Sequence, residues 1–299
     1  MTRTKWIAVI AAVFGVVALS GLAILGQQGC GSQSEASGCT RVLFIGNSYT
    51  YVNDLPAMFA ELAHSGGHRV ETGMMAVGGG TLADHAASAA TAAKLTSAKW
   101  DLVVLQEQSQ IPSVDQLRQS EMYPAARRLA DTIYRQGARP MFFLTWAHRD
   151  GWPENGLPDY ASMQSAIDAG YLAIAAEEQA AVAPVGVAWE AVLKQAHPAL
   201  WQDDGSHPTT AGTYLAACVF YATVFHQSPR GLAYHADLSA VDAAILQTVA
   251  AETVLDDPGK WGAAALRPAS PTGDVSQPAP DSTRGSSPNG WFASRRIHT

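Results

Sequence analysis

Two segments that lie far apart in the chain contain residue types that together could perform nucleophilic catalysis. Ser48 follows the apolar run 41–46, and the motif Asp204-Gly-Ser-His207 comes much later. A histidine can take the proton of a serine hydroxyl when a carboxylate fixes the tautomer of the imidazole and stabilises its charged form. Each segment alone has a structural alternative, because serine often caps a helix and Asp-x-x-His is a common pattern. Together they predict a serine nucleophile with a histidine base.

Two further segments could stabilise an anion that forms during such a reaction. Gly78-Gly79-Gly80 follows a second apolar run, and glycines let backbone N–H groups come close to a ligand, although a tight turn would need them too. Gln106, Gln108 and Gln110 follow a third run. Amide side chains there could donate to an oxyanion, although a polar surface loop would have the same composition.

The hydrophobic pattern explains how these segments could meet. Short apolar runs alternate with segments of helical spacing, which indicates a parallel sheet covered by helices on both faces. The expected strands are 41–46, 69–77, 100–105, 140–145 and 181–185, and the expected helices are 55–65, 82–96, 122–136, 163–178, 188–196, 209–225 and 238–255. Active sites in such sheets lie beyond the carboxyl ends of the strands, where the serine, glycine and glutamine segments stand.

The order and spacing of these segments over residues 42–212 resemble the SGNH (GDSL-like) hydrolase superfamily. Its members have a serine block after the first strand, a glycine block after the second, an amide block after the third, and a late Asp-x-x-His. The GNSYT motif at 46–50, the DGSHP motif at 204–208 and the runs 103–110 and 184–189 are similar to a bacterial subgroup. The resemblance implies an α/β fold, a three-layer α/β/α sandwich with a central parallel sheet of flavodoxin-like type.

The resemblance also implies a role for each residue of the predicted site. Ser48 would be the nucleophile, His207 the base and Asp204 the acid that orients it. The backbone N–H groups of Ser48 and Gly79 would form two arms of the oxyanion hole. No cofactor is implied.

The sequence departs from the family pattern at two places. Asn47 stands where the usual Gly-Asp-Ser motif has aspartate, which is a mild change because that aspartate is not the triad acid. The amide block lacks the usual asparagine, so a glutamine would provide the third oxyanion donor, or the hole would work more slowly with two donors. An ungapped count from Asp101 favours Gln110, and Gln108 is the alternative if the loop curls differently.

Several other residues could shape the substrate cleft. Trp146, His148 and Trp152 follow the fourth expected strand, so they would lie at the catalytic edge. His85 follows the glycines and could line the pocket, with a surface or capping role as the alternative. Cys218 lies in an apolar helical stretch and is expected to be a buried core thiol.

Composition and charge exclude some partners. Lys and Arg total 19 against 26 Asp and Glu, a net charge of −7, and no basic block stands out, so nucleic acid is not an expected partner. The 3 cysteines contain no Cys-x-x-Cys pair, and the histidines have no convincing metal-ligand spacing, so no metal is predicted.

The two ends of the chain differ from the middle. Residues 6–25 are uncharged and follow Arg3 and Lys5, which predicts an export signal over 1–26 that can stay as a membrane anchor. A linker, 27–38, precedes the hydrolase-like domain, 39–262, and the Pro- and Ser-rich segment 263–299 is expected to be a disordered tail. Cys30 has two alternatives, lipidation after Gly29 as in a lipoprotein, or a disulfide with Cys39 in an oxidising compartment.

These observations predict an exported serine ester hydrolase, membrane-anchored or secreted, that works through an acyl-enzyme. Removal of acetyl groups from a carbohydrate is one candidate reaction, and lipase- or thioesterase-type acyl hydrolysis is also open. A non-catalytic carbohydrate-binding protein on the same fold is a hypothesis of a different class, with the altered amide block as a sign of lost activity. The presence of Ser48, Asp204 and His207 together favours catalysis. The acyl group, the alcohol and the oligomeric state are not predicted.

Overall fold

Five short apolar runs form one parallel sheet at the centre of the computed structural model. The strands are β1 (Cys39–Gly46), β2 (Arg69–Ala76), β3 (Leu102–Leu105), β4 (Arg139–Phe143) and β5 (Ala181–Ala183). Their order is β2-β1-β3-β4-β5, and every neighbouring pair is parallel. This is the flavodoxin-like order, in which β1 and β3 lie side by side at the point where the winding direction reverses. The predicted fold class is confirmed.

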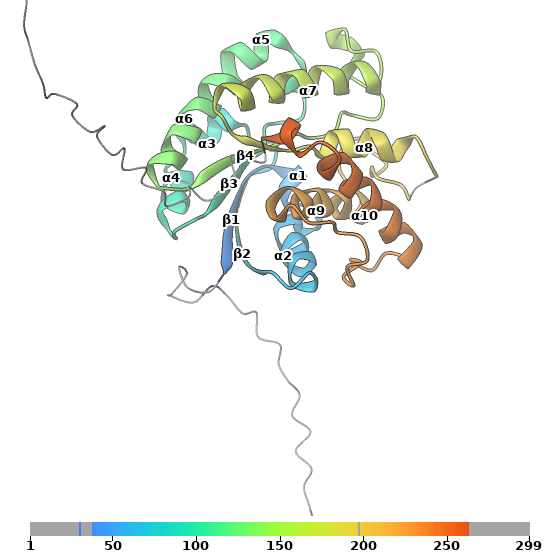
Figure 1. The fold of residues 1–299 in the computed structure, drawn as a ribbon. Helices are drawn as coiled ribbons and strands as arrows, with labels where there is room; N and C mark the ends of the chain where they lie inside the picture. The colour runs from blue at the N-terminus through green and yellow to red at the C-terminus, as the bar shows by residue number, and fades with distance from the viewer. Residues whose placement is uncertain (1–29, 31–37, 197, 263–299) are drawn as a thin grey trace, which may run out of the picture. The chain divides into compact units, whose positions relative to one another are not determined.

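Helices cover both faces of the sheet, so the domain has three layers (Figure 1). One face carries α2 (Leu55–Ser65), α8 (Val185–Leu193), α9 (Thr210–Phe225) and α10 (Ala240–Leu255); the other carries α3 (Leu82–Ala87), α4 (Ala89–Thr96), α6 (Tyr123–Arg135) and α7 (Tyr160–Glu177). The shorter pieces are α1 (Ser48–Tyr51), α5 (Asp115–Leu117), a π-helical turn (Arg118–Met122) and 3₁₀ turns at Val52–Asp54, Ile111–Ser113, Pro153–Asn155 and Pro258–Trp261.

Two expected helices differ from the observed ones. The segment 82–96 is two helices, because Ser88 has an extended backbone (φ −85°, ψ 122°) and its side chain accepts a hydrogen bond from Thr91 N to start α4. The helix expected at 188–196 begins at Val185 instead, directly after Pro184. The backbone N–H groups at the start of a helix have no acceptor inside the helix, so a proline, which lacks this N–H, costs no hydrogen bond there.

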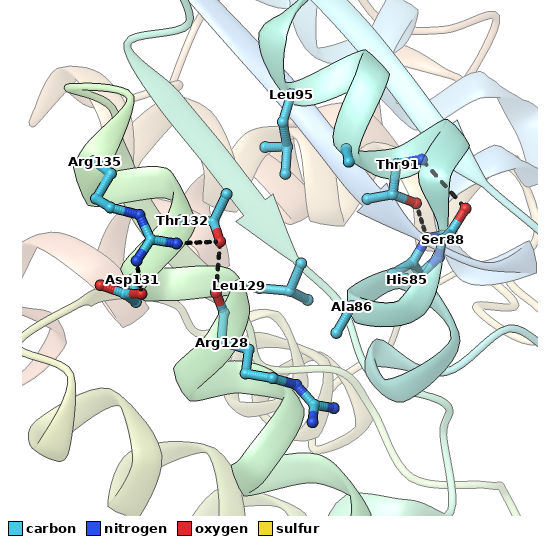
Figure 2. A pocket seen from close by; sticks show the side chains of 11 residues that line it. His85, Ala86, Ser88, Thr91, Leu95, Arg128, Leu129, Asp131, Thr132 and Arg135 are labelled. Atoms are coloured by element: carbon cyan, nitrogen blue, oxygen red, sulfur yellow. Dashed lines mark hydrogen bonds and ion pairs between the residues drawn. The ribbon is translucent and has the colours of Figure 1, made fainter.

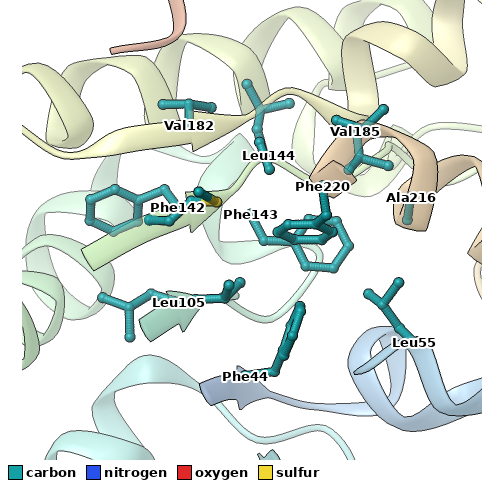
Figure 3. Close-up of a cluster of buried hydrophobic side chains, with 14 of the residues drawn as sticks. Phe44, Leu55, Leu105, Phe142, Phe143, Leu144, Val182, Val185, Ala216 and Phe220 are labelled. Atoms are coloured by element: carbon teal, nitrogen blue, oxygen red, sulfur yellow. The ribbon is translucent and has the colours of Figure 1, made fainter. Parts of the chain in front are cut away.

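The core between the sheet and α9 is built from aromatic rings of distant segments. Phe44 of β1 and Phe143 of β4 both meet Phe220 of α9 edge to face, with ring centroids 5.2 and 5.1 Å apart, respectively (Figure 3). All three side chains are fully buried. This packing fixes the strands that end at the predicted site.

The structure describes residues 30, 38–196 and 198–262. The predicted export segment 1–26, most of the linker 27–38 and the tail 263–299 lie outside these residues and stay predictions. Within the described ranges, no helix combines the length and the apolar character needed to cross a membrane. The expected core thiol, Cys218, is fully buried and free.

Cys30 is joined to Cys39 by a disulfide, the second of the two alternatives for this residue. The sulfur of a disulfide cannot also carry a lipid, so the two alternatives exclude each other. The backbone at Cys30 is held further by β1 and β2, because its N–H donates to Glu71 Oε2 (3.1 Å) and its carbonyl accepts from the guanidinium of Arg41 (2.7 Å).

Candidate active site

The structure brings together the three residues of the predicted triad. Ser48 Oγ lies 2.9 Å from His207 Nε2, and His207 Nδ1 lies 2.6 Å from Asp204 Oδ2. Ser48 is the first residue of α1, directly beyond β1, so the triad lies at the carboxyl edge of the sheet beside the β1/β3 switch point. One imidazole nitrogen faces the hydroxyl and the other faces the carboxylate, which is the arrangement that lets a histidine act as a base.

Four consecutive residues build the acid–base half of the site. Asp204 Oδ1 accepts hydrogen bonds from the backbone N–H groups of Ser206 and His207, both at 2.9 Å, which leaves Oδ2 for the imidazole. Gly205 between them has φ +69°, a conformation that side chains rarely adopt. Partial burial tends to raise the pKa of Asp204, but the hydrogen bonds from Ser206 and His207 outweigh it and lower the pKa to about 2.

The turn that presents Ser48 is held by its neighbour Asn47. The Asn47 side chain accepts from Tyr49 N (3.1 Å), capping α1, and donates to the carbonyl of Gly80 (3.0 Å). An aspartate could accept the first of these bonds but could not donate the second. Asn47 therefore ties the nucleophile turn to the glycine block, which gives the departure from the family motif a physical role.

The side chain of Gln106, the first residue after β3, anchors the same turn with its amide oxygen and its amide nitrogen. Its Oε1 accepts from Asn47 N (2.8 Å) and Thr50 Oγ1 (2.9 Å), and its Nε2 donates to Asn47 Oδ1 (2.9 Å). A Cβ atom on Gly46 would lie 2.3 Å from that Oε1, so the close approach requires glycine there. Both amide ends of Gln106 are occupied, and the idea that it could donate to an oxyanion is wrong.

The two backbone groups predicted for the oxyanion hole are available as donors. In the described part of the chain, no hydrogen bond uses the N–H of Ser48 or of Gly79. Gly80 N donates to Val77 O (2.9 Å) and Gly79 has φ +66°, so the glycines form a tight turn. The two alternatives for the glycine block are therefore compatible: it forms a tight turn, and the Gly79 N–H has no acceptor among the described residues.

The two glutamines proposed as the third donor are held differently. Gln108 Oε1 accepts from the backbone N–H groups of Gln110 (2.8 Å) and Ile111 (3.3 Å), which fixes the orientation of its amide. Its Nε2 makes only long contacts, 3.3 Å to Gln110 Oε1 and 3.5 Å to Ser109 Oγ. The Gln110 side chain has that single long contact. Among the described residues, neither glutamine side chain bonds to Ser48 or Gly79.

Two aromatic rings pack beneath His207, and this packing was not predicted from the sequence. Tyr49 meets His207 edge to face with centroids 5.9 Å apart, stacks on Trp146 at 4.5 Å, and shares a hydrogen bond with Ser206 Oγ (2.7 Å). Burial raises the pKa of Tyr49 to about 12, so its hydroxyl stays protonated. Trp146 has no exposed surface and donates to Ser206 O, so its expected place at the cleft rim is wrong. It supports the Asp204–His207 turn from below.

His148, in the loop after β4, lies beside the site. Its Nε2 lies 3.0 Å from Ser109 Oγ, and burial lowers the pKa of the imidazole, while Asp204 and His207 are near enough to act on it in opposite directions. Trp152 of the same loop is partly buried against the core. Ser109 was a member of the amide block with no individual prediction, and no pattern in the sequence distinguished it.

His85 makes no hydrogen bond to Ser48, Asp204 or His207 in the described part of the chain. It is buried, with Nε2 2.8 Å from the Gly46 carbonyl and Nδ1 3.0 Å from Thr91 Oγ1. It borders a separate cavity of about 250 Å³ between α3, α4 and α6, which is lined also by Leu95 and Leu129 (Figure 2). The surface alternative is therefore wrong, because the buried imidazole bonds to the end of β1.

No group of three or more His, Cys, Asp or Glu side chains within residues 38–196 and 198–262 is arranged to hold a metal ion.

The comparisons with known proteins agree with this geometry. No family model matches the sequence, and no curated protein does. A solved structure from Slackia heliotrinireducens, assigned as an SGNH hydrolase, is 30% identical, with a TM-score of 0.53, and the match covers 61% of this chain and 97% of that one. A DUF4886 family protein from Bacteroides uniformis shares the fold at 19% identity and a TM-score of 0.63, over 73% and 95% of the two chains.

The sheet order, the site at its switch point and the match to the Slackia protein define the class. The chain belongs to the SGNH hydrolase superfamily. It is accordingly a hydrolase that acts on ester bonds.

Proposed function

We propose that the protein is a serine ester hydrolase that works through an acyl-enzyme on Ser48, with His207 as the base and Asp204 as the residue that orients it. The observation that carries this proposal is the continuous chain of hydrogen bonds from Ser48 Oγ through the imidazole to Asp204. No described residue accepts from the backbone N–H groups of Ser48 and Gly79, so both can donate to the oxyanion that forms on the substrate.

The reaction follows from these positions. Ser48 Oγ attacks the ester carbonyl while its proton passes to His207 Nε2, and the carbonyl oxygen becomes an oxyanion that accepts from the two amides. The tetrahedral intermediate then breaks the bond to the alcohol oxygen, which leaves with the proton from His207. Water repeats the sequence on the acyl-Ser48 bond, releasing the acid and the free serine. Asp204, ionised because its pKa is about 2, stabilises the imidazolium in both halves.

Gln108 is the better candidate for the third oxyanion donor, in place of the Gln110 favoured by the ungapped count. Its amide oxygen is anchored by two backbone N–H groups, so its NH₂ group is oriented before substrate arrives. A fixed donor costs no reorganisation when the oxyanion forms. Gln110 has one long side-chain contact and no such anchor.

The substrate class that suits the site is a small acyl group, such as acetyl, on a hydroxyl-rich alcohol such as a carbohydrate. Polar side chains lie beside the Asp204–His207 turn: Ser206 belongs to it, and His148, which bonds to Ser109, is close enough for Asp204 and His207 to act on it. Such groups can exchange hydrogen bonds with sugar hydroxyls, whereas a long acyl chain needs an extended apolar lining. Export to an oxidising compartment is supported by the Cys30–Cys39 disulfide, since such bonds rarely persist in the cytosol.

The test compares the purified full-length protein on acetylated xylo-oligosaccharides, acetylated monosaccharides and p-nitrophenyl esters of increasing chain length. We expect turnover of acetyl esters, falling steeply beyond butyryl, and none in Ser48→Ala. A preference for long acyl chains would move the assignment to a lipase-type activity. Binding of the sugar with no turnover of any ester would instead support the non-catalytic hypothesis.

A further inference from the structure

One carboxyl group beside the oxyanion hole is buried and bridges its two loops. Glu107 has no exposed surface, and its Oε1 accepts hydrogen bonds from Leu82 N (3.1 Å) and Gln108 N (2.7 Å). Leu82 is the first residue of α3 and lies three positions after Gly79, and Gln108 carries the proposed third donor. A single oxygen atom therefore connects the glycine loop with the amide loop.

The surroundings of Glu107 make this buried carboxyl destabilising to the folded protein. Its second oxygen, Oε2, is buried and has no hydrogen-bond partner among the described residues. The charged side chains that act on it, Glu121 after α5 and Asp84 on α3, are both acidic. The backbone N–H of Glu107 donates to Tyr171 Oη (3.0 Å), which holds the residue in place but does not neutralise it. A buried carboxyl with an unpaired oxygen destabilises a fold, so its presence points to a role other than packing.

We propose that Glu107 is a positioning residue of the oxyanion hole. By accepting from both loops at one oxygen, it sets the separation of the Gly79 N–H and the Gln108 side chain, so that both point at the same oxyanion. The inference rests on the proposed function, because it needs an oxyanion at this place. Burial raises the pKa of Glu107 to about 7, although the hydrogen bonds from Gln108 and Leu82 partly oppose the effect.

If Glu107 positions the oxyanion donors, its loss should lower kcat and leave KM nearly unchanged. The negative charge on the substrate oxygen develops only on the way to the transition state, so a displaced donor weakens transition-state binding and leaves substrate binding nearly unchanged. Glu107→Ala removes the bridge. Glu107→Gln keeps an oxygen that can accept from both N–H groups, so it should restore most of the lost rate.

The experiment measures kcat, KM and the affinity for phenylboronic acid, which forms a tetrahedral adduct on a reactive serine, for both variants in the full-length protein. The matched control is Asp168→Asn, since Asp168 is a partly buried carboxyl that accepts from Gln164 on the same helix and has no hydrogen bond to either loop among the described residues. On p-nitrophenyl acetate we expect kcat of Glu107→Ala to fall by about tenfold to a hundredfold, below the loss of a whole donor. Boronate affinity should fall in parallel, KM should stay within about threefold, and Glu107→Gln and Asp168→Asn should both stay near wild type.

Other outcomes overturn the inference. A folded Glu107→Ala protein with wild-type kcat and boronate affinity would show that the bridge is not needed. Equal losses in Glu107→Ala and Glu107→Gln, with KM rising in step, would indicate a general structural effect. If Glu107→Ala does not fold, Glu107→Gln with tenfold lower boronate affinity despite a native circular dichroism spectrum would contradict the proposed bridge. A wild-type protein that neither hydrolyses the ester nor binds the boronate would overturn the proposed function, and the inference with it.

Discussion

The two halves of the active site are constructed in opposite ways. The acid–base half is one turn, in which Asp204 and His207 bond to each other and to the backbone between them, and their side chains stay 47% and 36% exposed. The oxyanion half joins the segments after β1, β2 and β3 through the fully buried side chains of Gln106 and Glu107. The bonds between Asp204 and His207 are local, whereas the second half depends on long-range polar contacts inside the core. Mutations in the first half should therefore lower kcat without changing stability, whereas mutations in the second half should change both.

The largest effect is expected where the two halves meet. Ser48→Ala removes the nucleophile, whose hydroxyl donates a single side-chain hydrogen bond to His207 Nε2 from a half-buried position. We expect kcat for acetyl esters to fall by roughly four to six decades, with an unchanged melting temperature by circular dichroism. Near-wild-type turnover in the variant would show that another residue is the nucleophile.

Asp204→Asn tests the acid–base half alone. The variant cannot stabilise the imidazolium and favours the wrong imidazole tautomer, so kcat should fall by up to about four decades with little change in KM. Because the pKa of Asp204 is lowered to about 2, its stabilising charge is present above the ordinary value of 3.8 and is lost only as the pH falls toward 2. A rate loss between about pH 4 and 6 in the wild type is thus not expected to come from this carboxyl. A variant with more than a tenth of the wild-type kcat would contradict the assignment.

The two glutamines test the oxyanion half. Gln108→Ala removes the anchored amide, and we expect kcat to fall by about two to three decades, the range for one lost donor. Gln110→Ala should cost less than about tenfold, because that side chain has one long contact. Both are measured on p-nitrophenyl acetate. A larger loss at Gln110 would restore the choice based on sequence spacing, and wild-type rates in both would mean that the amides of Ser48 and Gly79 suffice.

The smallest effect concerns the stability of the oxyanion half. The pKa of Glu107 is raised by burial from 4.5 to about 7, so between these values the folded protein keeps a proton that the unfolded chain has released. The free energy of unfolding should therefore decrease as the pH rises through this window and then level off. Glu107→Gln abolishes this titration. We expect the urea midpoint of the wild type, relative to that of the variant, to fall between about pH 4.5 and 7, whereas a difference that stays constant would contradict a buried, titrating carboxyl.

The strands and the proximity of Asp204 to His207 could be predicted from the sequence because both are local patterns. Each strand is a short apolar run, and the order of strands and helices limits a parallel sheet to few arrangements. The Asp204-Gly-Ser-His207 turn brings its own carboxylate and imidazole together within four residues, so spacing alone carried the information.

The buried contacts that hold the oxyanion half together had no comparable signal in the sequence. Gln106 and Glu107 look like the start of a polar loop, since charged and amide side chains are mostly exposed, yet both are fully buried. Their partners Asn47, Thr50 and Leu82 lie far away in the chain. Trp146 was misplaced for the same reason, because only the packed structure shows that Tyr49 and Trp189 enclose it on both faces.

The most direct test of the account is covalent labelling of the nucleophile. A fluorophosphonate transfers its phosphonyl group to an activated serine oxygen with loss of fluoride, which copies the first step proposed for the ester. We expect intact-protein mass spectrometry to show one adduct per chain, peptide mapping to place it on Ser48, and ester hydrolysis to decline in proportion to labelling. Ser48→Ala should take up no label, and His207→Ala should react far more slowly. Full ester turnover by a protein whose Ser48 is completely labelled, or an adduct on a different residue, would contradict the account.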